Sequence, residues 1–152
     1  MASTASIGGH PIHPMLVVFP IGLWIFSLAS DLIFLSGGDA TWHATALYAM
    51  GGGILGALAA AVPGAIDLFT IADSKVKRIG LIHMALNLSV VVLFLVNFFW
   101  RMQASPEAKG PIWLSVIAIV LLAVSGWLGG EMVYVHGAGV RGQLEGTASR
   151  RR

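Results

Sequence analysis

The stretch that decides the fold is RIGLIHMALNLSVVVLFLVNFFWR, residues 78–101. It is longer than the roughly 20 apolar residues that a helix needs to cross the hydrocarbon core of a bilayer. Six of its residues nevertheless follow steps of three and four, which places them on one helix face: His83, Asn87, Val90, Phe94, Asn97 and Arg101. Four of these six are polar, so this face should point into a helix bundle and not toward lipid.

The two ionisable residues of that face lie at opposite ends of it. His83 and Arg101 are 18 residues apart, which is five helical turns and about 27 Å along the axis. One ionisable group therefore lies near each leaflet. The asparagines between them are either hydrogen-bonding groups that join helices or parts of a site. A buried ionisable residue in a membrane indicates function by default.

The composition of the 152-residue chain indicates a membrane domain. Hydrophobic residues make up 57% of it and charged residues only 11%, whereas roughly a quarter of a soluble domain is charged. The sequence has no cysteine, which excludes disulfides, iron–sulfur clusters, thiolate metal sites and covalently attached c-type haem. No basic patch is interleaved with aromatic residues, so nucleic acid is not an expected partner.

Four hydrophobic segments predict four transmembrane helices in a lipid bilayer. They cover residues 15–35, a segment from residue 41 past residue 61 with a kink or break at Pro63 and Gly64, residues 78–101, and residues 112–130 with a last turn or two over 131–136. The loops are short, so the predicted fold is an all-α, integral membrane, up-down four-helix bundle. No strand is expected. The bundle should occupy residues 1–142, followed by a basic, disordered tail over residues 143–152. The first apolar segment lacks the flanks of a signal peptide, so we expect it to stay as an anchor.

The basic residues predict the orientation in the membrane. Four spans put both termini on one side, where seven basic residues fall against two on the other side. The seven are Lys75, Lys77, Arg78, Arg141, Arg150, Arg151 and Arg152, and the two are Arg101 and Lys109. The positive-inside rule then predicts a protein of a cell (inner or plasma) membrane with both termini in the cytoplasm.

The ionisable residues fall into two sets, one in each half of the bilayer. The set on the side of the termini is His10, His13, Asp67, His83, Glu131 and His136, and the far-side set is Asp31, His43, Asn97 and Arg101. His13 and Asp31 are also 18 residues apart and share a helix face. We therefore expect His13 to lie level with His83, and Asp31 to form an ion pair with Arg101. This pair either holds the helices in register or belongs to a site.

The histidines near the chain ends have two interpretations each. GHPIHP at residues 9–14 presents His10 and His13 on a rigid entry to the first helix, because Pro14 suits a first helical turn and Pro11 stiffens the approach. They are either ligands or interfacial residues that cap the bundle. His136 is either a ligand or a basic residue at the C-terminal end of a helix dipole, before Gly137 ends the helix.

Three stretches of the chain resemble one family. They are HPIHPMLVVFPIGLW at residues 10–24, the pair His83 and Asn87, and SGWLGGEMVYVHGAGV at residues 125–140. The family is the predicted membrane proteins catalogued as domain-of-unknown-function family 2231, and the resemblance covers about residues 8–141. It carries no settled activity. It implies four transmembrane helices, family-pattern positions for the six residues of the set near the termini, and relatives joined to Rieske-type or cytochrome-c-type domains. We expect any redox partner of this chain to be a separate protein.

These residues favour an electron-transfer protein that holds a non-covalent b-type haem and exchanges electrons with quinone or a partner redox protein. Such a haem needs one or two neutral imidazoles from different helices and an apolar slot. His83 is the first candidate ligand, His13 and His136 compete for the other face, and His10 and Asn87 join the same cofactor site. Arg78 could meet the propionates.

The remaining polar residues receive roles from the same hypothesis. Asp67 and Glu131 could orient imidazoles or take protons, as the catalytic groups of the site. The far-side set of Asp31, His43, Asn97 and Arg101 would bind quinone or a second haem. Whether the protein is an enzyme, such as a subunit of a membrane oxidoreductase, is left open.

Two alternatives stay beside the haem hypothesis. His13, His83 and His136, with the nearby carboxylates, supply donors that suit Zn or Fe, and an open coordination position would make a membrane hydrolase. The second alternative is a cofactor-free accessory subunit within a homo-oligomer or a larger membrane complex.

Overall fold

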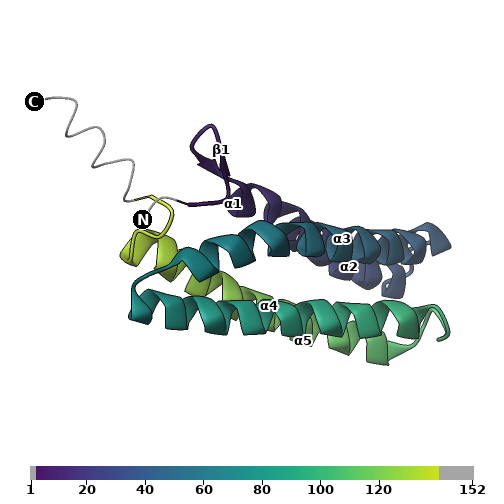
Figure 1. The fold of residues 1–152 in the computed structure, drawn as a ribbon. Helices are drawn as coiled ribbons and strands as arrows, with labels where there is room; N and C mark the ends of the chain where they lie inside the picture. The colour runs from purple at the N-terminus through teal and green to yellow at the C-terminus, as the bar shows by residue number, and fades with distance from the viewer. Residues whose placement is uncertain (1–2, 141–152) are drawn as a thin grey trace, which may run out of the picture.

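Four long helices form the protein in a computed structural model, which describes residues 3–140. They are α2 (Val18–Leu35), α3 (Ala40–Thr70), α4 (Ser74–Arg101) and α5 (Lys109–Gly130). Each belongs to a segment long and apolar enough to cross a membrane. The α2–α3 and α4–α5 connections lie at one end of the bundle, and the α3–α4 connection lies at the other (Figure 1). The predicted all-α up-down bundle is therefore confirmed, while the tail over residues 143–152 lies outside the described residues.

The helices extend further than the hydrophobic segments alone indicated. A short helix, α1 (Ile12–Leu16), leads into α2 through Val17, whose backbone is itself helical at φ −64° and ψ −19°. Of the kink or break predicted at Pro63 and Gly64, the break is wrong, because α3 is one helix through Pro63 to Thr70. Membrane helices tolerate proline where neighbouring groups satisfy the backbone. Here Nδ1 of His13 donates to the carbonyl of Ala60 at 2.8 Å, in the turn before the proline.

A small β-hairpin precedes the first helix, although no strand was expected. Strands β1 (Ser6–Ile7) and β2 (His10–Pro11) pair antiparallel. Gly8 and Gly9 join them with φ of 57° and 82°, which is the left-handed geometry that a tight two-residue hairpin turn requires. The sequence pattern missed this hairpin because two-residue strands are too short to show an alternating pattern.

Two aspartates begin the helices that follow the loops. Oδ1 of Asp39 accepts a hydrogen bond from Thr41 N at 2.8 Å, at the start of α3. Oδ1 of Asp73 accepts from Lys75 N at 2.8 Å and from Val76 N at 3.2 Å, at the start of α4. The Val76 and Lys75 N–H groups lower the pKa of the exposed Asp73 carboxyl, because they stabilise its charged form.

The bundle is built from two helical hairpins that bury equivalent positions. We call α1–α3 the first hairpin and α4–α5 the second hairpin. Four of the five buried residues of α2 have buried counterparts 70 positions later in α4: Pro20 and Val90, Trp24 and Phe94, Ser27 and Asn97, and Asp31 and Arg101. All four buried residues of α5 lie 65 positions after buried residues of α3: Ala46 and Pro111, Met50 and Ser115, Gly53 and Ala118, and Ala60 and Ser125.

This recurrence makes the chain an internal structural repeat. Because α2 and α4 cross the membrane in the same direction, the two hairpins are parallel repeats, as in membrane proteins whose halves are related about the membrane normal. Such proteins build their sites where the repeats meet. A functional site is therefore expected at the interface between the two hairpins.

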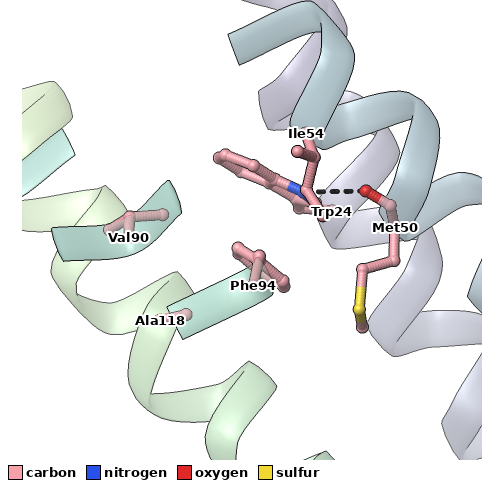
Figure 2. Close-up of a cluster of buried hydrophobic side chains, with 6 residues drawn as sticks. All are labelled: Trp24, Met50, Ile54, Val90, Phe94 and Ala118. Carbon is pink, nitrogen blue, oxygen red and sulfur yellow. Dashed lines mark hydrogen bonds between the residues drawn. The ribbon is translucent and has the colours of Figure 1, made fainter. Parts of the chain in front are cut away.

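The centre of that interface is a dry aromatic layer. Trp24 and Phe94 occupy equivalent positions and stack on each other, with ring centroids 4.3 Å apart and planes 12° apart. Figure 2 shows the indole lying between Ile54 and the ring of Phe94, with Nε1 of Trp24 donating to the carbonyl of Met50 at 3.3 Å. Val90 and Ala118 complete the cluster from the second hairpin. Stacked aromatic rings add about 0.5–1.5 kcal/mol beyond the area they bury.

Candidate functional site

His13 and His83 face each other across the interface between the two hairpins. Their ring centroids are 6.4 Å apart and their planes are perpendicular within 2°, at 88°. His13 lies in α1 and His83 in α4, 70 positions later, so the two imidazoles occupy equivalent positions of the repeat. The expectation that they lie level with each other is confirmed.

Each imidazole is fixed in the same way by its own hairpin. Nδ1 of His13 donates to the carbonyl of Ala60 in α3, and Nδ1 of His83 donates to the carbonyl of Ser125 in α5, both at 2.8 Å. A carbonyl can only accept, so the proton of each ring is on Nδ1 and the lone pair is on Nε2. A histidine held through Nδ1 by a backbone carbonyl is oriented to use Nε2 as a ligand.

A glycine one turn beyond each carbonyl makes room for the ring. A Cβ on Gly64 would lie 2.7 Å from Nδ1 of His13, and a Cβ on Gly129 would lie 3.1 Å from Cε1 of His83. These two glycines are again 65 positions apart. A Cβ at residue 64 would thus clash with the His13 ring, and a Cβ at residue 129 would make an unusually tight contact with the His83 ring.

His83 has a further partner that His13 lacks. Nδ2 of Asn87 donates to Nε2 of His83 at 3.0 Å and to the backbone carbonyl of His83 at 2.9 Å. The position equivalent to Asn87 in the first hairpin is Val17, which has no polar side chain. The two histidines therefore share an Nδ1 bond to a backbone carbonyl, whereas His83 alone also has Ser125 Oγ at 3.0 Å from its Nδ1 and Asn87 at its Nε2.

The far-side residues form a second polar layer on the same interface. Arg101 donates to the two carboxylate oxygens of Asp31 at 2.5 and 2.6 Å, and the two side chains are only 3% and 2% exposed. Nε of Arg101 donates to Oδ1 of Asn97 at 3.0 Å. Nδ2 of Asn97 donates to Ser115 Oγ and to the carbonyl of Pro111, both at 2.8 Å. The predicted ion pair is present.

The far-side polar layer joins the two hairpins through a buried ion pair. The carboxylate of Asp31, the guanidinium of Arg101 and the amide of Asn97 all have hydrogen-bond partners within it, as a buried ion pair requires if it is to be tolerated. His43, which we expected in the same set, instead lies against Phe34 with ring centroids 5.4 Å apart. It makes none of the hydrogen bonds of the layer. Asp31, Asn97 and Arg101 are all buried, at 2%, 0% and 7% exposure.

Asp67 holds the start of the described chain against the bundle. Its Oδ1 and Oδ2 accept from Ser3 Oγ at 2.9 and 2.7 Å, and Oδ1 also accepts from Ala5 N at 2.9 Å. The carboxylate therefore orients the N-terminal segment, and neither histidine ring hydrogen-bonds to it. The rings are oriented by backbone carbonyls where we expected carboxylates.

Glu131 and His136 lie together on the π-helix η1 (Glu131–Val135) and its end. Nε2 of His136 is 3.9 Å from Oε1 of Glu131. It is buried and makes no hydrogen bond within the described residues. Residues 3–140 contain no group of three or more His, Asp or Glu side chains placed to hold a metal ion. His136 is thus not brought into a common ligand set with His13 and His83.

The other two residues of the expected cofactor site lie at the surface. His10 is exposed in strand β2, and Arg78 is exposed in the second turn of α4. Neither forms part of the histidine layer. The residues that sequence reasoning missed are Ser125 and Ala60, which act through their carbonyls, and Gly64 and Gly129. The recurrence of H-x₁₀-W and H-x₁₀-F, and of residues 60–64 and 125–129, was the available signal.

Comparison with known proteins agrees with the architecture. The family model described as "Predicted membrane protein (DUF2231)" matches residues 9–142. No curated protein and no solved structure gives a significant match to the chain. The matched segment contains both histidines of the layer, the ion pair and all four spans. The chain therefore belongs to this family of predicted membrane proteins.

Proposed function

We propose that the protein is a membrane electron-transfer protein that holds a non-covalent b-type haem between His13 and His83. The observation that carries the proposal is the pair of imidazoles facing each other across the repeat interface, 6.4 Å apart. Each is tied through Nδ1 to a backbone carbonyl. Haem in helix bundles is held by imidazoles that project inward from different helices.

The spacing of the rings suits two ligands of one metal. Metal–imidazole bonds are about 2 Å long, so two rings bound through Nε2 on opposite sides of one ion have their centres about 6 Å apart. Haem, when bound, supplies one-electron redox chemistry. The chain contributes the orientation of both rings, through Ala60 and Ser125. It also contributes an apolar layer, Trp24 over Phe94, that keeps water out from the far side.

The number of donors favours haem over a hydrolytic metal ion. A catalytic zinc site uses three protein ligands and keeps a fourth position for water. The described residues bring two imidazoles together and no third His, Asp or Glu group. Two protein donors would suffice for haem, because the porphyrin supplies the other ligands of its iron. Exposed Arg78, at the start of α4 on the same side of the bundle, remains the proposed partner for the propionates.

Electron exchange would take place in the half of the bilayer that holds the chain ends. The histidine layer lies there, and the far-side polar layer is closed by its own hydrogen bonds. The proposed partner is therefore a quinone or a separate redox protein that approaches from the side of the termini. The positive-inside rule assigns this side to the cytoplasm.

The test is an absorption spectrum of the protein purified in detergent from cells supplied with a haem precursor, followed by reconstitution with hemin. We expect about one haem per chain, with a Soret band that shifts on reduction by dithionite. His13→Ala and His83→Ala should each lose the wild-type spectrum. His10→Ala and His43→Ala are matched controls, because those histidines lie outside the layer, and they should keep it.

Two results would overturn the proposal. One is folded wild-type protein that takes up no hemin. The other is a wild-type spectrum in both His13→Ala and His83→Ala, which would show that any bound haem lies elsewhere.

A further inference from the structure

The two halves of the histidine layer differ at one position. Asn87 follows His83 by four residues, and Val17 follows His13 by four residues, so the two side chains occupy equivalent places. The backbone N–H of Val17 donates to the carbonyl of His13 at 3.1 Å, so Val17 is also one helical turn after its histidine. An amide thus stands beside one imidazole of the pair, and a hydrocarbon side chain stands beside the other.

The amide of Asn87 occupies the only lone pair of the His83 ring. Nδ1 of His83 carries the proton that goes to Ser125 O, so Nε2 is the acceptor for Asn87 Nδ2. The second N–H of the same amide goes to the backbone carbonyl of His83 at 2.9 Å. Both amide protons are therefore used within one helical turn. No described residue makes a hydrogen bond to Nε2 of His13.

From this difference we propose that Asn87 is a positioning residue. Its amide occupies the lone pair of His83 Nε2 and keeps that nitrogen from binding a metal until the amide moves away. His13 would hold a metal-containing cofactor such as haem first, and His83 would bind it only after the Asn87 amide rotates away from Nε2. The inference rests on the proposed function and assigns an order to its two ligands. It also reverses the simpler expectation that Asn87 helps to bind the cofactor, because one lone pair cannot serve an amide and a metal together.

The hydrogen bond from Asn87 to Nε2 of His83 costs little free energy to break. It is one neutral side-chain hydrogen bond, and such a bond shifts an equilibrium by about 2- to 10-fold. The Ser125 bond stays in place and keeps the ring oriented for its second role. Asn87 therefore biases the choice between one and two imidazole ligands without excluding either.

The first experiment needs no cofactor. Diethyl pyrocarbonate modifies imidazole nitrogens that have a free lone pair, and mass spectrometry reports the rate at each histidine of the detergent-solubilised protein. We expect His13 to react faster than His83. Asn87→Val, which installs the residue of the first hairpin, should raise the His83 rate by about 2- to 10-fold. The reciprocal Val17→Asn should slow His13 by a similar factor.

Asn87→Ala is a control for packing defects in Asn87→Val, because it removes the amide without adding a branched side chain. An unchanged His83 rate in both Asn87→Val and Asn87→Ala would overturn the inference. So would a wild-type His83 that reacts as fast as His13. His10, which is exposed, serves as an internal standard for reagent and should react alike in every variant.

The second experiment separates this inference from the proposed function. Hemin titration of wild type and Asn87→Val should show tighter binding by about 2- to 10-fold in the variant and a larger six-coordinate, low-spin fraction. If wild type takes up no hemin, the proposed function fails, while the labelling rates still decide the role of Asn87. If wild type binds hemin and Asn87→Val leaves both affinity and spin state unchanged, the ordering of the ligands is wrong.

Discussion

Replacing Arg101 with methionine would remove the cation of the far-side layer and leave the carboxylate of Asp31 without its partner. Both side chains are almost fully buried, at 3% and 2% exposure, so solvent screens the pair very little. Removing one partner of such a pair costs about 3–5 kcal/mol, because the remaining charge stays buried. Arg101→Met also removes the hydrogen bond from Nε to Asn97 Oδ1.

Reversible unfolding in mixed micelles, followed by tryptophan fluorescence, measures this loss. We expect a decrease of about 3–5 kcal/mol in the free energy of unfolding for Arg101→Met and for Asp31→Leu. The double variant should lose clearly less than the sum of the two, since it leaves no unpaired charge. Arg78→Met, which changes an exposed basic residue on the same helix, should stay within about 0.5 kcal/mol of wild type.

The repeat supplies a sharper form of the same test. Asp31 and Arg101 occupy equivalent positions of the two hairpins, so the exchange Asp31→Arg with Arg101→Asp should rebuild the pair in the opposite sense. The recovery should be partial. The new arginine would face Ser27 and Met50 in place of Asn97 and Ser115, and two hydrogen bonds worth about 1 kcal/mol each would be missing. Additive losses in the double variants would refute the reasoning.

Glycine substitutions, a split of the chain and the loss of a helix cap test the architecture. Gly64→Ala and Gly129→Ala place a Cβ 2.7 Å from His13 Nδ1 and 3.1 Å from His83 Cε1, so each should lower stability by about 1–3 kcal/mol. Gly22→Ala, whose Cβ meets nothing within 4 Å, should be neutral or stabilising in the same unfolding assay. Residues 1–72 and 73–152, co-expressed as two chains, should copurify through the repeat interface. Halves that both insert into the membrane but never associate would contradict this. Asp73→Ala removes the cap of α4. Because backbone N–H groups lower the pKa of Asp73, the stabilisation is present above the unfolded-state pKa and is lost as pH falls through the lower folded-state pKa. Unfolding curves of wild type and Asp73→Ala should therefore differ at pH 7 and converge once the pH falls below the lowered folded-state pKa of Asp73.

Side-chain periodicity was sufficient to predict the spans and the two polar layers. The steps of three and four from His83 to Arg101, and the matching 18-residue spacing from His13 to Asp31, placed one imidazole pair and one ion pair at opposite ends of the bundle. Helical geometry alone fixes such levels, because the rise per residue is constant. Residues far apart in sequence could be matched only because both helices cross the membrane in the same direction.

The groups that orient the imidazoles could not be predicted in the same way. Ala60 and Ser125 accept the Nδ1 hydrogen bonds through backbone carbonyls, which every residue has, so these two bonds give no sequence signal. Only Ser125 adds a side-chain contact, with its Oγ 3.0 Å from Nδ1 of His83. Asp67 and His136 were assigned to the site because their residue types suit it and their level in the membrane is right. Their actual partners, Ser3 and Glu131, depend on the β-hairpin and the π-helix. Neither element has a periodic pattern that a sequence reveals.

The aromatic layer at the middle of the interface separates the two polar layers, one of which lies in each half of the bilayer. Trp24, Phe94 and Val90 are 2%, 0% and 0% exposed, and a proton cannot move through such a layer without water or a chain of exchanging groups. The histidine layer and the Asp31–Arg101 layer, about 27 Å apart, are thus insulated from each other. Any proton taken up or released at His13 or His83 would be exchanged with a single aqueous compartment. The buried rings of Trp24 and Phe94 also interrupt any continuous aqueous path along the repeat axis.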